Sequence, residues 1–167
     1  MFILILITAT AILWQEDFNS GTQVMKQLAD YHVQIRYGDG RVLLRANPRF
    51  EGFSSSWLAA KGSFALKPDD LLKLRIRVSE NTVRLRYFYY DHNQEIYLSG
   101  TEYIQKTEDW QKVEIPLRSA TPFPSLKFPY LLIQDQRPPI YLFFENRDPG
   151  WLEVEIDQIV LVGSRGE

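Results

Sequence analysis

Trp110-Gln111-Lys112-Val113-Glu114-Ile115-Pro116-Leu117 alternates apolar and polar residues, and two later stretches, 140–146 and 152–162, follow the same rule. A two-residue period is typical of a β-strand with one buried face, whereas an amphipathic helix repeats every three to four residues. No helical period appears in this last third of the chain. The three segments therefore predict strands.

Further alternating segments precede these three, at 31–37, 42–46, 57–66, 72–78, 83–90 and 95–103. Gly38-Asp39-Gly40 separates the first two, and Asp-Gly between alternating runs predicts a tight β-hairpin. Residues 23–30 are the exception, since Val24 and Leu28 are spaced for one or two helical turns. Roughly ten short strands with regular turns predict an all-β architecture.

Residues 119–139 hold five of the nine prolines, at positions 122, 124, 129, 138 and 139. Proline is excluded from central strands, and long loops inside compact domains are often functional. We therefore predict a Pro-rich loop here, interrupted by a short strand at 130–133. No repeat or linker divides the chain, so residues 12–167 are predicted to form one domain.

The composition is that of a soluble globular protein, with 45% apolar and 24% charged residues. The formal charge of −2 gives no reason to expect nucleic acid as a partner. The chain has no cysteine, which excludes disulfides, thiolate metal sites and a Cys nucleophile.

The N-terminus leaves two interpretations open. Residues 2–7 are uninterrupted apolar sequence, and Ala9-Thr10-Ala11 fits a signal-peptidase site, although no Lys or Arg precedes the run. Residues 1–11 are then a signal peptide, or else the hydrophobic lead-in to a first buried strand. We favour export, which predicts a secreted, periplasmic or cell-surface protein. The run is too short for stable membrane insertion.

Catalytic signals are few. The chain has two histidines and lacks Gly-x-Ser-x-Gly, His-Glu-x-x-His and phosphate-loop motifs. Glu153, Glu155 and Asp157 share one strand face, on the order of 7 Å apart at the Cα level, which could serve a glycosidase or lyase. A solvated, charged sheet face explains them better, and we predict no catalysis.

A second polar set lies on either side of the turn at 79–82. If 72–78 and 83–90 pair as a hairpin, Arg75, Arg77, Arg84, Arg86, Phe88 and Tyr90 share one face. Guanidinium groups donate paired hydrogen bonds and aromatic rings stack on pyranose faces, so this face predicts binding of a flat polar ligand. The alternative is a solvated face balanced by acidic residues on the next strand.

Other aromatic residues extend this prediction. Tyr141 joins the same face if its strand is a neighbour, His92 is either a loop-tip contact or a solvated turn residue, and Trp57 and Trp151 are either exposed platforms or buried. Trp110 is most simply a core residue. The complete candidate ligand-binding set is Arg77, Arg84, Arg86, Phe88, Tyr90, His92, Tyr141 and Trp57.

Four segments taken in order carry a family resemblance: Glu16-Asp17-Phe18-Asn19-Ser20-Gly21, Leu66-Lys67-Pro68-Asp69-Asp70, Trp110-Gln111-Lys112-Val113 and Val154-Glu155-Ile156-Asp157-Gln158-Ile159. Together they resemble the galactose-binding-like, jelly-roll carbohydrate-binding modules, over Asp17 to Gly163. The resemblance implies an antiparallel two-sheet β-sandwich with jelly-roll topology. It also implies non-catalytic binding of a polysaccharide or oligosaccharide, along one sheet face or at loop tips.

The resemblance also implies a structural calcium ion, with Asp17, Asn19 and Asp157 at the positions of its ligands. Asn19 stands where family members often have Glu, which predicts a weaker site. Glu155-Ile156-Asp157 also resembles the Glu-x-Asp-x-x-Glu strand of one glycosidase group, but Val160 replaces its final Glu. Because one scaffold serves many roles, a structural or adhesion protein that binds a protein partner through the same face, or through loop 119–139, is the alternative function.

Overall fold

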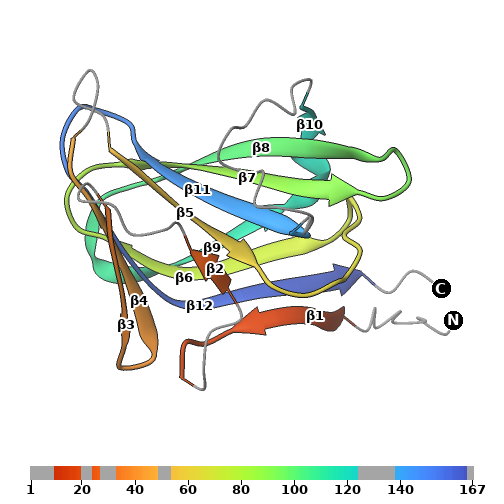
Figure 1. The fold of residues 1–167 in the computed structure, drawn as a ribbon, viewed down its shortest axis with the longest axis horizontal. Helices are drawn as coiled ribbons and strands as arrows, with labels where there is room; N and C mark the ends of the chain where they lie inside the picture. The colour runs from red at the N-terminus through yellow and green to blue at the C-terminus, as the bar shows by residue number, and fades with distance from the viewer. Residues whose placement is uncertain (1–9, 20–23, 27–32, 49–53, 124–137, 165–167) are drawn as a thin grey trace, which may run out of the picture.

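The computed structural model describes residues 10–19, 24–26, 33–48, 54–123 and 138–164. In these residues, strands form two antiparallel sheets that pack face to face as two layers (Figure 1). The first, sheet A, has the order β3 (Val33–Gly38), β4 (Arg41–Ala46), β12 (Leu152–Ser164), β6 (Leu71–Val78) and β9 (Thr107–Pro116), with β1 (Thr10–Glu16) also paired to β12. The second, sheet B, has the order β10 (Thr121–Pro122), β8 (Ile96–Ile104), β7 (Val83–Asp91), β11 (Ile140–Asn146), β5 (Ser55–Ala60) and β2 (Val24–Lys26).

The chain crosses repeatedly between the sheets. It passes from β4 in sheet A to β5 in sheet B, returns to β6, crosses again to β7 and β8, and later ends in β12 of sheet A. Every strand pair is antiparallel, so the all-β, antiparallel two-sheet sandwich with jelly-roll topology is confirmed. No helix among the described residues is long and apolar enough to cross a membrane.

The main core lies between the two sheets. Alternate residues of each strand point inward, as the two-residue period requires. β6 contributes Leu72, Leu74, Ile76 and Val78, and β7 contributes Val83, Leu85, Tyr87 and Tyr89. The alternate residues of the same strands therefore lie on the two outer faces of the sandwich. A ligand that binds along a sheet would contact these residues.

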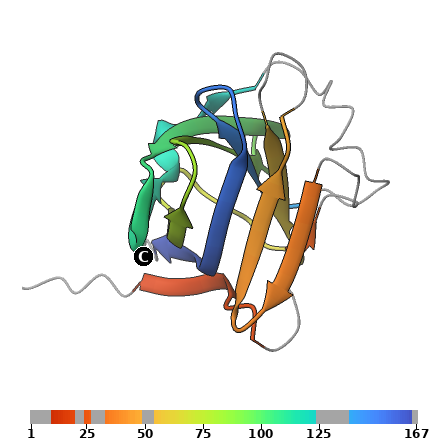
Figure 2. The ribbon, with the colours of Figure 1, turned by 90° about the vertical axis from the view of Figure 1, so that its left-hand side faces the viewer.

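The hairpin at Gly38-Asp39-Gly40 is confirmed. β3 and β4 pair antiparallel, and the pair lies next to β12 in sheet A (Figure 2). Asp39 and Gly40 have φ angles of 54° and 67°, the left-handed conformation that the tightest hairpin turns need at both central residues.

Two local expectations differ from the structure. The helical turns expected at 23–30 are wrong where the chain is described, because Val24–Lys26 is strand β2, paired with β5. In the Pro-rich segment, Leu117–Ser119 forms a 3-10 turn and Pro122 lies in β10, at an edge of sheet B where proline loses no ladder bond. The short strand expected at 130–133 lies outside the described residues.

The expected pairing of 72–78 with 83–90 is wrong. β6 pairs with β12 and β9 in sheet A, whereas β7 pairs with β8 and β11 in sheet B. The turn between them passes from one layer to the other, as two backbone hydrogen bonds show: the Ser79 amide donates to the carbonyl oxygen of Glu153 in β12, and the Arg147 amide after β11 donates to that of Thr82. Arg75 and Arg77 are therefore on the opposite outer face from Arg84 and Arg86.

Candidate ligand-binding face

The outer face of sheet B collects most of the predicted ligand-binding residues. In the register of β7 and β11, Tyr141 lies beside Phe88, Phe143 beside Arg86 and Glu145 beside Arg84. β5 continues the rows on the far side of β11, with Trp57 beside Phe143. The expectation that Tyr141 joins Arg84, Arg86, Phe88 and Tyr90 on one face is thus confirmed as geometry, although Arg77 is not part of it.

The aromatic residues of this face form a second hydrophobic cluster, separate from the main core. It contains Trp57, Ala59, Phe88 and Tyr141, with Tyr97, Phe123 and Phe143 packed against it. Phe123 meets Phe88 edge to face at 5.3 Å between ring centroids, and Trp57 meets Tyr141 at 6.1 Å. Edge-to-face contacts at these distances stabilise beyond simple burial.

This cluster is covered rather than open. The exposed fraction is 1% for Phe88, 3% for Tyr141, 5% for Trp57 and 8% for Tyr90. The interpretation of Trp57 as an exposed platform is therefore wrong in this conformation, and the rings of Phe88, Tyr90 and Tyr141 are likewise unavailable for stacking. Burial raises the pKa of the Tyr141 hydroxyl, further helped by Tyr97 beside it.

The accessible polar part of the face is a pair of arginines that share one carboxylate. The Nε and Nη2 atoms of Arg84 lie 2.9 Å and 2.7 Å from Oε2 of Glu145. Nη1 of Arg86 is 3.9 Å from the same oxygen, beyond hydrogen-bond distance. The Arg86 guanidinium instead lies over the Phe88 ring, 5.2 Å from its centroid. The buried cluster thus fixes the position of Arg86 from below.

The two ends of the face differ. At one end His92 is exposed in the β7–β8 turn and packs edge to face on Tyr90, with ring centroids 5.0 Å apart. At the other end Tyr103 of β8 lies beside Arg84 and is 53% exposed. Arg147 places its guanidinium 5.7 Å from the centroid of the Tyr103 ring.

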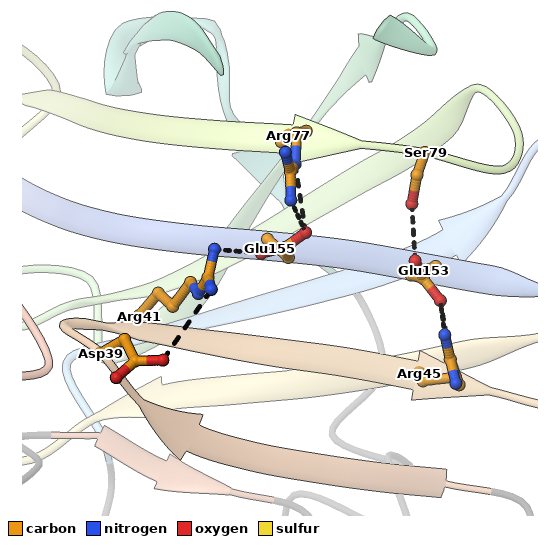
Figure 3. Close-up of polar contacts among 7 residues, drawn as sticks. All are labelled: Asp39, Arg41, Arg45, Arg77, Ser79, Glu153 and Glu155. Carbon is orange, nitrogen blue, oxygen red and sulfur yellow. Dashed lines mark hydrogen bonds and ion pairs between the residues drawn. The ribbon is translucent and has the colours of Figure 1, made fainter. Parts of the chain in front are cut away.

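On the outer face of sheet A, arginines and carboxylates form a network of ion pairs, part of which is drawn in Figure 3. Glu155 of β12 lies between two arginines, with Arg41 Nη1 at 3.0 Å and Arg77 bonded through Nε and Nη2. Glu153 accepts hydrogen bonds from Arg45 Nε at 2.7 Å and from Ser79 Oγ at 2.9 Å. The carboxylates thus have the neighbours expected of a solvated sheet face, and for Arg75 and Arg77 the alternative of acidic partners on the next strand is what the structure shows.

Trp110 packs against this ion-pair network and is not part of the main core. Arg75 and Arg77 place their guanidinium carbons 5.3 Å and 5.5 Å from its ring centroid. The expectation that Trp110 is a core residue is therefore wrong. Trp151 is 50% exposed, in the turn before β12, so of its two interpretations the exposed one is confirmed.

The residues proposed for calcium fit the ion only in part. Glu16 pairs with Ile159, so the turn at Asp17 and Asn19 starts close to Asp157 along the sheet. Oδ1 of Asp157 is buried without a hydrogen-bond partner, as a metal ligand would be. However, Oδ2 of Asp157 is 2.7 Å from Arg75 Nη1, and Asp17 Oδ1 accepts the Asn19 amide at 3.0 Å.

The described residues contain no group of three or more His, Asp or Glu side chains arranged for a metal. If the ion binds, Asp157 and the oxygens of the Asp17–Asn19 turn would hold it, and it would join that turn to β12. Calcium therefore stays a proposal.

Sequence reasoning missed two parts of this site. The buried cluster had a signal, because Tyr87-Phe88-Tyr89-Tyr90 and Ile140-Tyr141-Leu142-Phe143-Phe144 are apolar on both faces, as in strands covered on both sides. Tyr103 and Arg147 had no local signal, since only the register of β8 and the end of β11 bring them to Arg84.

No protein-family model and no curated protein sequence matches the chain. Solved structures do. The family 11 carbohydrate-binding module of cellulosomal cellulase Lic26A-Cel5E of Clostridium thermocellum is 14% identical, with a TM-score of 0.61, over 93% of this chain and 95% of that chain. The fold is that of a carbohydrate-binding module.

Two further solved structures agree with this fold. The family 11 module from Clostridium thermocellum in complex with a β-1,3-1,4-mixed-linked tetrasaccharide is 13% identical, with a TM-score of 0.59, over 95% of this chain and 98% of that one. A mutant of the family 29 module CBM29-2, made to probe ligand recognition, is 10% identical, with a TM-score of 0.52, over 92% and 85%. The likeness to such modules is structural, because sequence identity is low throughout.

Proposed function

We propose that this protein is a non-catalytic carbohydrate-binding domain and that it binds a polysaccharide or oligosaccharide on the outer face of sheet B. The supporting observation is the position of Arg86, whose guanidinium is held over the buried Phe88 ring and has, among the described residues, no hydrogen bond to a carboxylate. The resemblance to carbohydrate-binding modules supports the ligand class.

In this proposal the candidate residues have two roles. Arg84 and Arg86 contact the ligand directly, because a guanidinium donates planar, paired hydrogen bonds to sugar oxygens. Phe88, Tyr90, Tyr141 and Trp57 support the arginines from the cluster beneath, and His92 borders the cluster at its far end. Arg77 takes no part in this site, since it lies on sheet A.

The absence of catalysis is part of the proposal. Each carboxylate on the outer face of β12 is occupied by an arginine: Glu153 by Arg45, Glu155 by Arg41 and Arg77, and Asp157 by Arg75. A general acid needs a proton at working pH and therefore a raised pKa. At Glu153, burial alone would raise the pKa, but the hydrogen bonds from Arg45 and Ser79, with the charges of Arg45 and Arg77, outweigh it and hold the pKa low. Burial does raise the pKa of Asp157, but Arg75 is bound to its Oδ2 atom, and this pairing is the reason to expect no catalysis there. We also propose that the protein is exported.

A glycan-binding experiment tests the proposal. Wild-type protein is run by affinity electrophoresis through gels that contain a panel of polysaccharides, beside Arg84→Ala, Arg86→Ala and the control Arg75→Ala on the opposite sheet. We expect retardation of wild type and Arg75→Ala, and its loss in the other two, with unchanged thermal unfolding. Equal retardation of all four proteins would place the site elsewhere, and no retardation by any glycan would refute the function.

A protein partner is the second candidate, favoured by two exposed aromatic residues at one end of the sandwich. Tyr103 is held beside Arg147, and Asn81 donates its side-chain amide to the carbonyl oxygen of Trp151. Exposed Tyr, Trp and Arg residues are typical anchors of protein interfaces. Co-purification with one defined protein, lost in Trp151→Ala, together with no retardation by any glycan, would favour this candidate.

A further inference from the structure

We propose that the ligand of the outer face of sheet B is an anionic polysaccharide, whose sugars carry carboxylate or sulfate groups. This inference rests on the proposed function and names its substrate class. It starts from an imbalance of charge at the Arg84 end of the face, on a chain whose formal net charge is −2.

Among the described residues, three guanidinium groups and one carboxylate lie at this end of the face. Arg84 and Arg86 come from β7, and Arg147 directly follows β11 and lies over Tyr103 of β8. Glu145 is the carboxylate on the same face, and Arg84 already takes its Oε2 atom with two nitrogens. Glu102 of β8 has the opposite side-chain direction, since it alternates with Tyr103, and Asp148 is exposed beyond the strand. Among the residues that the structure describes, positive charge is therefore in excess at this end of the face.

Sheet A provides an internal contrast. There, the arginines beside β12 each contact one of its carboxylates: Arg41 and Arg77 contact Glu155, Arg45 contacts Glu153 and Arg75 contacts Asp157. These guanidinium groups are already neutralised. The same strand-to-strand geometry in sheet B leaves Arg86 3.9 Å from Oε2 of Glu145, its nearest carboxylate oxygen among the described residues. A ligand that brings its own anionic groups would complete at Arg86 the pairing that sheet A makes internally.

The neighbours of Arg86 also suit a sugar ring. Phe143 of β11 is half-buried on one side of Arg86, and Thr101 of β8 is exposed on the other. A uronate or sulfated sugar could place its apolar C–H face against Phe143 and its anionic group on the guanidinium. Planar guanidinium donors match carboxylate and sulfate oxygens, and such charge-assisted hydrogen bonds are stronger than those to neutral hydroxyls.

The test compares anionic with neutral glycans by isothermal titration calorimetry. The carboxylated arm uses polygalacturonate and alginate, the sulfated arm uses carrageenan, and the neutral arm uses mixed-linkage β-glucan and galactomannan. We expect binding in an anionic arm that weakens about tenfold from low to high salt, because screening acts on charge pairs. Arg86→Gln should weaken it about tenfold as well, the usual effect of one lost charged hydrogen bond. Arg75→Gln on sheet A is the matched control and should bind as wild type.

Each other outcome has a distinct meaning. Binding in the carboxylated arm only, or in the sulfated arm only, supports the inference and identifies the group. Salt-insensitive binding of the neutral glycans with an affinity equal to that of the anionic ones overturns this inference and leaves the proposed function intact. Equal affinity for duplex DNA overturns it too, because charge alone would then explain the binding. Binding in none of the arms refutes both proposals, provided that thermal unfolding shows a folded protein.

Discussion

Gly100 of β8 lies opposite Tyr87 of β7, and the Tyr87 side chain occupies the space that a side chain at position 100 would need. A Cβ atom built on Gly100 would be 2.1 Å from Tyr87 Oη and 2.2 Å from Cζ. The Tyr87 hydroxyl is in turn 2.9 Å from Ser119 Oγ, so the ring cannot move away without losing that hydrogen bond. Sheet B therefore has glycine at this position for reasons of space.

Gly100→Ala should lower the free energy of unfolding by about 1–3 kcal/mol, the usual effect of overpacking a filled interior. Urea denaturation followed by fluorescence measures it. Gly38→Ala is the matched control, because nothing lies within 4 Å of a Cβ there. If both variants unfold at the same urea concentration, Tyr87 does not restrict position 100.

This relationship also shows what the sequence could and could not reveal. The alternation in 83–90 correctly places Leu85 and Tyr87 inward and Arg84 and Arg86 outward, because side-chain direction follows from the period of a strand alone. The Asp39-Gly40 turn was equally readable, because few residues adopt positive φ at two successive positions.

The assignment of strands to sheets was not readable in the same way. Four residues, 79–82, join β6 to β7, and a hairpin loop of that length has the same local composition as a crossing between layers. What decides is the pairing of β6 with β12 and of β7 with β11, which lie more than fifty residues away along the chain. The prediction of the candidate site was therefore correct in grouping Arg84 with Tyr141. It was wrong in adding Arg77, which lies on the other outer face.

Glu153 should make the protein less stable in acid. Its pKa lies below the ordinary 4.5, because the hydrogen bonds from Arg45 and Ser79 outweigh the opposing effect of burial. The unfolded chain then binds the proton at higher pH than the folded one, so this contribution is complete above pH 4.5 and is lost as the pH falls through the folded-state pKa.

Glu153→Gln should lower the free energy of unfolding at pH 7 by up to about 1 kcal/mol, since the Arg45 side chain is partly exposed and solvent screens the pair. The difference between variant and wild type should shrink between pH 5 and pH 3, measured as urea midpoints across that range. A difference that stays constant with pH would show that packing, and not the charge of Glu153, is responsible.

The core tyrosines should make the protein less stable in alkali. Burial raises the pKa of Tyr89 to about 12, helped by the charge of Asp91, and burial also raises the pKa of Tyr87. Between pH 10 and 12 the unfolded chain loses the Tyr89 proton while the folded chain keeps it, so stability falls as the pH rises through this window.

Thermal unfolding between pH 9 and 12 should show this loss in wild type and a smaller loss in Tyr89→Phe. The substitution is mild, because the Tyr89 hydroxyl makes only a 3.5 Å contact with the Leu117 carbonyl oxygen. Tyr103→Phe, at an exposed position, is the control and should follow wild type. Identical pH profiles for all three proteins would contradict the assignment to Tyr89.

Calcium should stabilise the protein through Asp157, if the buried Oδ1 atom of this residue completes a site with the Asp17–Asn19 turn. An ion that binds only the folded state raises the free energy of unfolding by RT ln(1 + c/Kd), where c is the free ion concentration. A gain of about 1 kcal/mol corresponds to a rise in Tm of about 2–4 °C for a domain of this size. We therefore expect a higher Tm in millimolar calcium than in EDTA.

Asp157→Asn should abolish this difference in Tm. Glu153→Gln should retain it, because Glu153 accepts hydrogen bonds from Arg45 and Ser79 instead. Equal Tm values for wild type in calcium and in EDTA would show that the protein binds no stabilising calcium. Arg75 would then be the one counter-charge of Asp157 among the described residues.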